Sequence, residues 1–317
     1  ALVRGYNPDA QATEKPMEIA FLNASIVTDG LPVTDPWFAG EPINYYYFGY
    51  FVAGLLSNLT STPAGVAFTL GLATTFALAT VAAAGVAVNL AERLSAPQRW
   101  VPPAAGIFAG FLLMFSGTLY SAWELLKAPS ETLEQSWWQG IGWSASRVIE
   151  DTGFPDGGPR TVISEFPAFT WVLGDLHPHV LAYPWLIAAI GLIANLAFVM
   201  GCRQSLRTMT SAGALIGLVI AALYAANTWD IPVVALLALV ALAFGVQTLG
   251  WTRSALVGAV IVTAAVIGLV PFSLHYAPPA GVAGAGENGV IPTWLPLGGW
   301  LSETIGFVTW DRSSLGE

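Results

Sequence analysis

The chain has 317 residues, of which 55% are hydrophobic and only 10% are charged, and its formal net charge is −9 at pH 7. This composition is typical of an integral membrane protein and excludes an ordinary soluble domain. The acidic balance argues against a nucleic-acid partner, and the single cysteine, Cys202, excludes an internal disulfide.

Six segments are apolar over the roughly 20 residues that a bilayer-crossing helix needs. They are residues 64–90, 101–120, 180–200, 212–227, 231–250 and 254–275. The sequence therefore predicts an all-α polytopic membrane protein with about six transmembrane helices, together with interfacial helices and long outer loops. The chain starts at Ala1 without an initiator methionine or a signal-peptide pattern, so we expect it to be a piece of a longer protein.

The same pattern divides the chain into five parts. Residues 1–63 form a first outer loop with an interfacial helix, residues 64–120 hold two spans, and residues 121–179 form a second outer loop. Residues 180–275 hold four spans, and residues 276–317 form an outer or interfacial tail that we expect to be cut short.

The short loops after the first, third and fifth spans carry a strong excess of basic residues. They hold Arg93, Arg99, Arg203, Arg207 and Arg253 against one acid, Glu92. Because arginine-rich short loops remain in the cytoplasm, the pattern predicts a multi-pass protein of the cytoplasmic (cell) membrane whose long acidic loops face outward. This alternation requires that residues 45–60 do not cross, so we expect them to form a helix at the outer interface.

The main concentration of ionisable groups lies in residues 165–179, E-F-P-A-F-T-W-V-L-G-D-L-H-P-H. In an extended chain Asp175, His177 and His179 point to one side, which suits a divalent metal such as Mg²⁺ or Mn²⁺. Pro178 favours an extended His177 and fits the first turn of a following helix, whose N-terminus attracts anions such as phosphate. The alternative is a set of hydrogen-bonded groups at a membrane interface.

A second acidic pair lies in the first outer loop. Glu14 and Glu18 are four residues apart, so their carboxylates share one face if residues 15–23 are helical. Neighbouring carboxylates raise the pKa of one partner, which suits proton transfer, or they share a metal ion. The alternative is a solvated helix face. Glu165, in the second outer loop, is another candidate base.

Other polar groups of the outer loops are candidates for binding a substrate. Asn44 and one of Tyr45, Tyr46 and Tyr47 are able to hydrogen-bond a phosphate or a sugar, although an interfacial aromatic belt also explains the tyrosines. Three successive tyrosines cannot all face one way on a helix. Arg147 offers a guanidinium fork that suits a lipid diphosphate, with a salt bridge to a neighbouring acid as the alternative.

Several motifs resemble those of a known family in their sequence and order. Five motifs carry the resemblance and occur in this order: T-E-K-P-M-E, D-P-W-F-A-G, I-N-Y-Y-Y-F-G, W-S-A-S-R and E-F-P…G-D-L-H-P-H. Over most of residues 4–230 the chain resembles the Chlor_Arch_YYY membrane proteins. Lys15 and Asp35 belong to these motifs and join the candidates for substrate binding. The family pattern has an aspartate at the position of Glu18, so this chain keeps the charge on a longer side chain, which weakens the case for Glu18 as the base.

The layout is also similar to that of the GT-C glycosyltransferases, whose first outer loop carries an essential acid and is followed by an interfacial helix. Glu14 or Glu18 and the Y-Y-Y segment are the counterparts here. The similarity implies a membrane glycosyltransferase that moves a sugar from a polyprenyl-phosphate donor to an acceptor on the outer face. The alternative is a non-enzymatic lipid-binding or scaffold subunit of a membrane complex. A transporter fits less well, because the spans hold almost no ionisable residues.

Overall fold

The computed structural model describes residues 9–94, 98–128, 130, 142–152 and 158–276. The chain divides into two compact units. Unit 1 consists of Ala1–Phe115 and Thr170–Tyr276, and unit 2 consists of Ser116–Phe169 and Ala277–Glu317. The predicted tail, residues 276–317, lies outside the described residues except for Tyr276.

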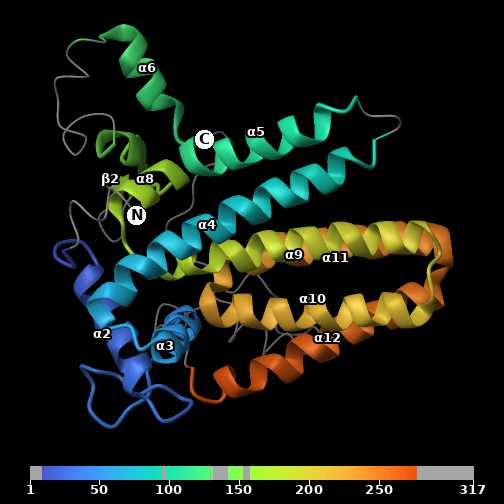
Figure 1. The fold of residues 1–317 in the computed structure, drawn as a ribbon, viewed down its shortest axis with the longest axis horizontal. Helices are drawn as coiled ribbons and strands as arrows, with labels where there is room; N and C mark the ends of the chain where they lie inside the picture. Colours follow the sequence, from blue (N-terminus) through green and yellow to red (C-terminus); the bar gives the residue numbers. More distant parts are fainter. Residues whose placement is uncertain (1–8, 95–97, 129, 131–141, 153–157, 277–317) are drawn as a thin grey trace. The chain divides into compact units, whose positions relative to one another are not determined.

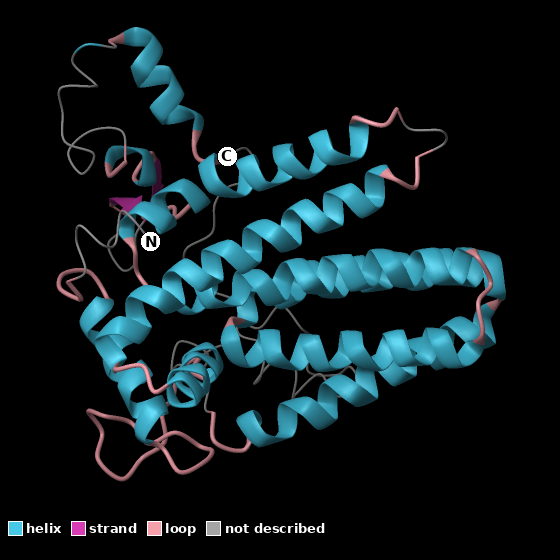
Figure 2. Ribbon diagram, viewed as in Figure 1, coloured by secondary structure: helices cyan, strands magenta, loops and turns pink. Residues whose placement is uncertain are grey.

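Long helices make up most of unit 1, as the apolar segments predict (Figure 1 and Figure 2). They are α4 (Ala64–Ala91), α5 (Val101–Phe115), α9 (Pro178–Gly201), α10 (Leu206–Ala226), α11 (Ile231–Leu249) and α12 (Trp251–Ser273). Five segments among the described residues are long and apolar enough to cross a membrane. They are α4, α9, α10, α12, and α11 together with the turn before it. A sixth span results if α5 and α6 (Leu119–Lys127) count as one broken segment. The predicted all-α polytopic membrane protein is confirmed.

The predicted span 101–120 consists of two helices instead of one. α5 ends at Phe115, and α6 begins only at Leu119. Ser116 and Gly117 lie between them, and serine–glycine pairs are common sites of sharp helix kinks. A Cβ atom at Gly117 would lie 2.8 Å from the ring of Phe166, so this position suits glycine alone.

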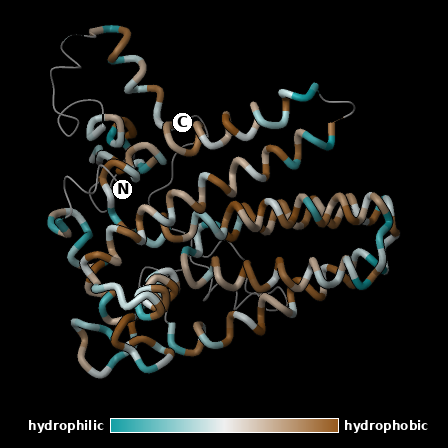
Figure 3. Tube along the Cα trace, viewed as in Figure 1, coloured by the Kyte–Doolittle hydropathy of each residue, from teal (hydrophilic) through white to brown (hydrophobic). Residues whose placement is uncertain are grey.

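Close packing holds the long helices of unit 1 together. α10 lies against α12, where a Cβ atom at Gly217 would collide with the backbone oxygen of Ile261. Small residues at such crossings let two backbones approach closely, which is how membrane helices associate. Figure 3 shows the hydrophobic colour along these helices and the hydrophilic colour at several of their connections.

Two shorter helices cover one end of unit 1. α2 (Lys15–Val27) includes residues 15–23, so the condition for a shared face of Glu14 and Glu18 is met, and it continues by one turn. α3 (Phe48–Thr60) has 13 residues and therefore spans about 20 Å, less than the roughly 30 Å thickness of the hydrocarbon core. It is too short to cross a membrane, as the arginine pattern requires. Phe21 and Tyr50 from these helices are buried in one cluster with Phe68 and Leu176.

The basic turns lie at the end of unit 1 that is opposite to α2 and α3. In Figure 1 the α4–α5 and α9–α10 connections lie at the right of the view, whereas α2 and α3 lie at the left. The first connection includes Arg93 and Arg99, and the second includes Arg203. Unit 1 therefore separates its acidic first loop from these arginines along the helix axes.

The described part of unit 2 holds α6, a single 3-10 turn η1 (Ser144–Ser146), and two antiparallel strands. β1 (Ile149–Thr152) pairs with β2 (Pro159–Val162), with Ile149 opposite Val162. The hydropathy pattern does not predict this hairpin. A further helix, α8 (Pro167–Leu173), begins in unit 2 and ends in unit 1.

Candidate active site at the start of α9

The segment G-D-L-H between α8 and α9 is extended at His177, as Pro178 predicts. His177 has φ −69° and ψ 154° and is the N-cap of α9, and Pro178 occupies its first turn. Gly174 has φ +71°, a left-handed conformation that favours glycine and turns the chain after α8. The side chains of this segment therefore stand at the end of unit 1 that holds α2.

Two carboxylates meet His177, one from Glu14, the N-cap of α2, and one from Glu18 in its first turn. Its Nδ1 atom lies 2.7 Å from Oε2 of Glu14 and 3.1 Å from Oε1 of Glu18. The other oxygen of Glu18 accepts the backbone N–H of Leu176 at 2.7 Å. The Glu18 side chain is fully buried, whereas that of Glu14 is 58% exposed. The predicted shared face of the two acids is confirmed, and only Glu14 is open to an incoming molecule.

A buried ion pair lies beside this cluster. Nζ of Lys15 is 2.6 Å from Oδ1 of Asp175, and both side chains are less than a tenth exposed. Thr13 donates its hydroxyl to the same oxygen at 2.8 Å. Ala12 and Thr13 both have positive φ, and this unusual turn carries Thr13 to Asp175. Sequence reasoning missed Thr13, because no local pattern marks it.

The histidine pair has its own supporting contacts. The hydroxyl of Tyr45 lies 3.4 Å from Nε2 of His177, and the rings of His177 and His179 are 5.1 Å apart. Nε2 of His179 lies 3.5 Å from the hydroxyl of Thr170, and its ring packs edge-on to Tyr183. Both imidazoles are thus held by contacts with neighbouring side chains.

Burial shapes the electrostatics of the cluster. Burial is the main cause that raises the pKa of Glu18, while the hydrogen bond from His177 lowers it and the charge of Asp175 raises it further. Tyr50 is fully buried, and its hydroxyl has no hydrogen-bond partner within the described part of the chain. Burial is the main cause that raises the pKa of Tyr50 well above its ordinary value, and the charge of Glu18 raises it further. The hydroxyl of Tyr50 therefore keeps its proton. Sequence reasoning missed Tyr50, which is one helical turn beyond Tyr47 on α3.

The described residues offer one group of side chains with metal-ligand geometry in unit 1. One ligand atom each from Glu14, Glu18 and His177 lies within 4.8 Å of the others. Two carboxylates and an imidazole suit Mn²⁺ and related divalent ions. This set shares only His177 with the predicted set of Asp175, His177 and His179, and Asp175 is engaged by Lys15. The predicted set stays a prediction.

The three successive tyrosines precede α3, which begins only at Phe48 and not at residue 45, and they face three different partners. Tyr45 reaches His177, Tyr46 packs against Tyr276 at 5.8 Å between ring centroids, and Tyr47 is buried against Phe272 at 5.4 Å. Only the first of them contacts the candidate site.

Asp35 and Asn44, the other candidates from the first outer loop, differ in their surroundings. Oδ1 of Asp35 accepts the backbone N–H groups of Trp37 and Phe38 at 2.8 and 3.0 Å, so this carboxylate stabilises its own turn. Asn44 is exposed, directly before Tyr45. Their binding roles stay predictions.

Glu165 and Arg147 belong to unit 2, whereas Glu14, Glu18 and His177 belong to unit 1. Glu165 is exposed. The guanidinium of Arg147 lies over the ring of Trp143 at 3.3 Å and donates to the hydroxyl of Ser146 at 2.5 Å. Arg147 also lines a hollow of about 410 Å³ with Tyr120 and Trp143. The roles predicted for Glu165 and Arg147 stay predictions.

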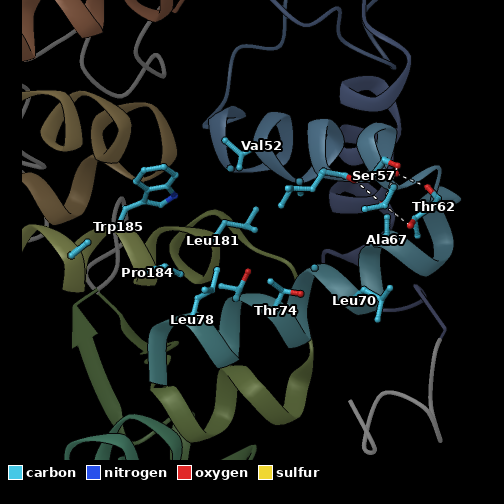
Figure 4. Close-up of a pocket in the computed structure, with 17 residues that line it drawn as sticks. Val52, Ser57, Thr62, Ala67, Leu70, Thr74, Leu78, Leu181, Pro184 and Trp185 are labelled. Carbon is cyan, nitrogen blue, oxygen red and sulfur yellow. Dashed lines mark hydrogen bonds between the residues drawn. The ribbon is translucent and has the colours of Figure 1, made fainter. Parts of the chain in front are cut away.

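An apolar groove of about 570 Å³ lies between α3, α4 and α9. Figure 4 shows Val52 of α3, Thr74 and Leu78 of α4, and Leu181 and Trp185 of α9 around it. Leu181 is one helical turn beyond His177, so the polar cluster and the groove are neighbours along α9.

Comparison with known proteins identifies a family. The model of a family described as "Uncharacterized membrane protein (DUF2298)" matches residues 1–311. No curated protein and no solved structure matches the chain.

Proposed function

This chain belongs to the DUF2298 family of membrane proteins, and we propose that it is a glycosyltransferase. It would move a sugar from a polyprenyl-phosphate donor to an acceptor on the outer face of the cell membrane. The observation that carries the proposal is the meeting of Glu14, Glu18 and His177 next to an apolar groove. The resemblances to the Chlor_Arch_YYY proteins and to the GT-C enzymes agree with it and stay predictions. The outward orientation rests on the arginine turns at the other end of unit 1.

Glu14 is the best candidate for the base. Its carboxylate is exposed and lies against His177, whereas Glu18 is fully buried. In this proposal Glu14 takes the proton of an acceptor hydroxyl as its oxygen attacks the anomeric carbon, and the bond from that carbon to the phosphate oxygen breaks. A single displacement of this kind inverts the anomeric centre. Glu18 is buried away from the acceptor, and its two oxygens contact His177 and the backbone N–H of Leu176.

A divalent cation, Mg²⁺ or Mn²⁺, is part of the proposal. Glu14, Glu18 and His177 fit as its ligands, since one oxygen of each carboxylate suffices and the second oxygen of Glu14 stays available for a proton. When bound, such an ion supplies positive charge for the leaving phosphate. The start of α9 adds the positive end of a helix dipole.

The test is sugar transfer by the purified protein in liposomes. A panel of radiolabelled polyprenyl-phosphate hexoses is supplied with membranes of the source cell as acceptor, and loss of label from the lipid phase is measured. We expect transfer by the wild type and a loss of about 100-fold or more for Glu14→Gln, the usual contribution of a general base.

Glu41→Gln is the matched control, because Glu41 is an exposed acid of the same loop outside the cluster. It should transfer like the wild type, and both variants should keep the melting temperature. Full activity of Glu14→Gln would remove the proposed mechanism. Glu165→Gln, measured in parallel, tells whether unit 2 supplies the base.

The apolar groove favours a second candidate function. A lipid-binding subunit of a membrane complex needs the groove and no chemistry. Stable lipid binding, together with the absence of transfer from every donor in the panel, would select this alternative.

A further inference from the structure

The groove between α3, α4 and α9 has the dimensions of a site for one lipid chain. It follows α4 from Ala67 to Leu78, about 16 Å at 1.5 Å per residue, and α9 from Leu181 to Ala188, about 10 Å. Both distances are well below the roughly 30 Å thickness of a hydrocarbon core. The groove is therefore suited to part of a long chain.

One end of the groove lies against the polar cluster. Gly49 is four residues after Tyr45, and Leu181 is one turn after His177. A Cβ atom at Gly71 would touch Leu176 at 3.5 Å, and the backbone N–H of Leu176 is held by Glu18. α9 thus reaches the groove one helical turn after His177, and α3 and α4 line it at Gly49 and Gly71. A molecule with its polar group at His177 would place its apolar part in the groove.

The groove is open along its side. Leu56, Leu70 and Leu78 line it, and each of these side chains is about half exposed. α4 is among the helices able to cross a membrane, so Leu70 and Leu78 would face hydrocarbon. A lipid chain can enter from the membrane without crossing the polar cluster.

The volume of the groove is comparable to that of one lipid chain. A water molecule takes up about 30 Å³ of liquid, and a chain carbon with its hydrogens is of similar size. The groove of about 570 Å³ therefore holds about 20 carbon atoms. This is about the size of one chain of four isoprene units.

We propose that this groove binds the phosphate-proximal part, about 20 carbon atoms, of the single isoprenoid chain of a polyprenyl phosphate. The inference rests on the proposed function for the identity of the ligand. It adds where the chain lies and how much of it the protein recognises. Carbons beyond the groove remain in the membrane and contribute little to affinity.

The experiment measures binding without sugar transfer. The purified protein in detergent receives geranyl, farnesyl, geranylgeranyl or undecaprenyl phosphate, and bound lipid is quantified by native mass spectrometry. We expect the affinity to rise at least about tenfold with each added isoprene unit up to geranylgeranyl phosphate, because each unit buries more apolar surface. Undecaprenyl phosphate should bind less than about threefold more tightly than geranylgeranyl phosphate.

A matched pair of variants tests the location. Thr74→Trp fills the groove from α4, and Ala77→Trp puts the same side chain on the same helix at an exposed position outside the groove. Thr74→Trp should abolish the gain between farnesyl and geranylgeranyl phosphate, and Ala77→Trp should keep it. Retention of the gain in Thr74→Trp, or an affinity that does not depend on chain length, would overturn the assignment.

Competition with phosphatidic acid distinguishes a site for the polyprenyl donor from a site for phospholipids in general. Phosphatidic acid should compete weakly with geranylgeranyl phosphate, and equal competition would also overturn the assignment. Binding as expected in a protein that transfers no sugar would contradict the proposed function and leave the groove assignment in place. Sugar transfer without the expected binding would contradict the groove assignment and leave the proposed function in place.

Discussion

Lys15 and Asp175 form a buried ion pair, with Nζ and Oδ1 2.6 Å apart. Lys15 is the first residue of α2, and Asp175 lies three residues before α9, so the pair ties the first loop to the segment that carries His177. Because both side chains are buried, water cannot solvate either charge if its partner is removed. The pair therefore determines the register in which Glu14 and Glu18 meet the histidine.

Lys15→Met should destabilise the protein strongly. It leaves the carboxylate of Asp175 buried without its cation, a loss of about 3–5 kcal/mol. Thermal unfolding in detergent measures the effect. The double variant Lys15→Met, Asp175→Leu removes both charges and should regain most of the stability. Equal melting temperatures for Lys15→Met and the wild type would show that the pair has no structural role.

Glu18→Gln should change how stability depends on pH. Burial raises the pKa of folded Glu18 above its ordinary value of 4.5, so the folded state keeps a proton that the unfolded state has released. The stability that this group contributes is fully present below pH 4.5 and is lost as the pH rises through the folded pKa. The wild type should therefore lose stability relative to Glu18→Gln between pH 4.5 and neutral pH.

Paired unfolding curves of the wild type and Glu18→Gln, recorded with a chelator so that no bound ion holds the charge, check this difference. A constant difference across the pH range, or one that grows in favour of the wild type as the pH rises, would contradict the buried position of Glu18.

Tyr45→Phe should reduce transfer with little change in stability. The hydroxyl of Tyr45 lies 3.4 Å from Nε2 of His177 and orients the ring whose other nitrogen faces the carboxylates. The loss of such an outer partner commonly reduces metal affinity or activity by about 10–100-fold. Tyr224→Phe, in α10, is the control and should transfer normally. If Tyr45→Phe kept full activity and full affinity for Mn²⁺, the orienting role would be wrong.

Gly217→Ala should weaken the packing of α10 on α12. The new methyl group would collide with the backbone oxygen of Ile261 and would lie 2.7 Å from Cβ of Ala264. Overpacking of this kind typically destabilises a protein by about 1–3 kcal/mol. Gly65→Ala is the control, because a Cβ atom there meets nothing within 4 Å. Its melting temperature should equal or exceed that of the wild type, and a stable Gly217→Ala would argue against this crossing.

The long helices could be predicted from the sequence because a membrane span must be both apolar and long. The segment predicted at 64–90 is α4, Ala64–Ala91, and the one at 231–250 is α11, Ile231–Leu249. The break at Ser116 and Gly117 could not be predicted in this way, because hydropathy does not indicate a local loss of helix. The shared face of Glu14 and Glu18 followed from helical spacing, and the extended His177 followed from Pro178.

The composition of the site could not be predicted in the same way. Asp175 and His177 are two residues apart, yet one pairs with Lys15 and the other with Glu14 and Glu18. Local spacing contains no information about which distant helix supplies the partners, so the contacts of Asp175 and His177 with Lys15, Glu14 and Glu18 could not be predicted. The buried hydroxyl of Tyr50 escaped for the same reason, since its burial results from the packing of α3 on α2.

The central claim is that Glu14 and His177 act together at one site of sugar transfer. A double-mutant cycle on the transfer rate, with Glu14→Gln, His177→Gln and the double variant, tests it most directly. Residues that act as a unit are strongly non-additive, so the double variant should transfer about as slowly as the slower single variant. Single effects that multiply in the double variant, or a wild type that transfers no sugar from any donor in the panel, would contradict the claim.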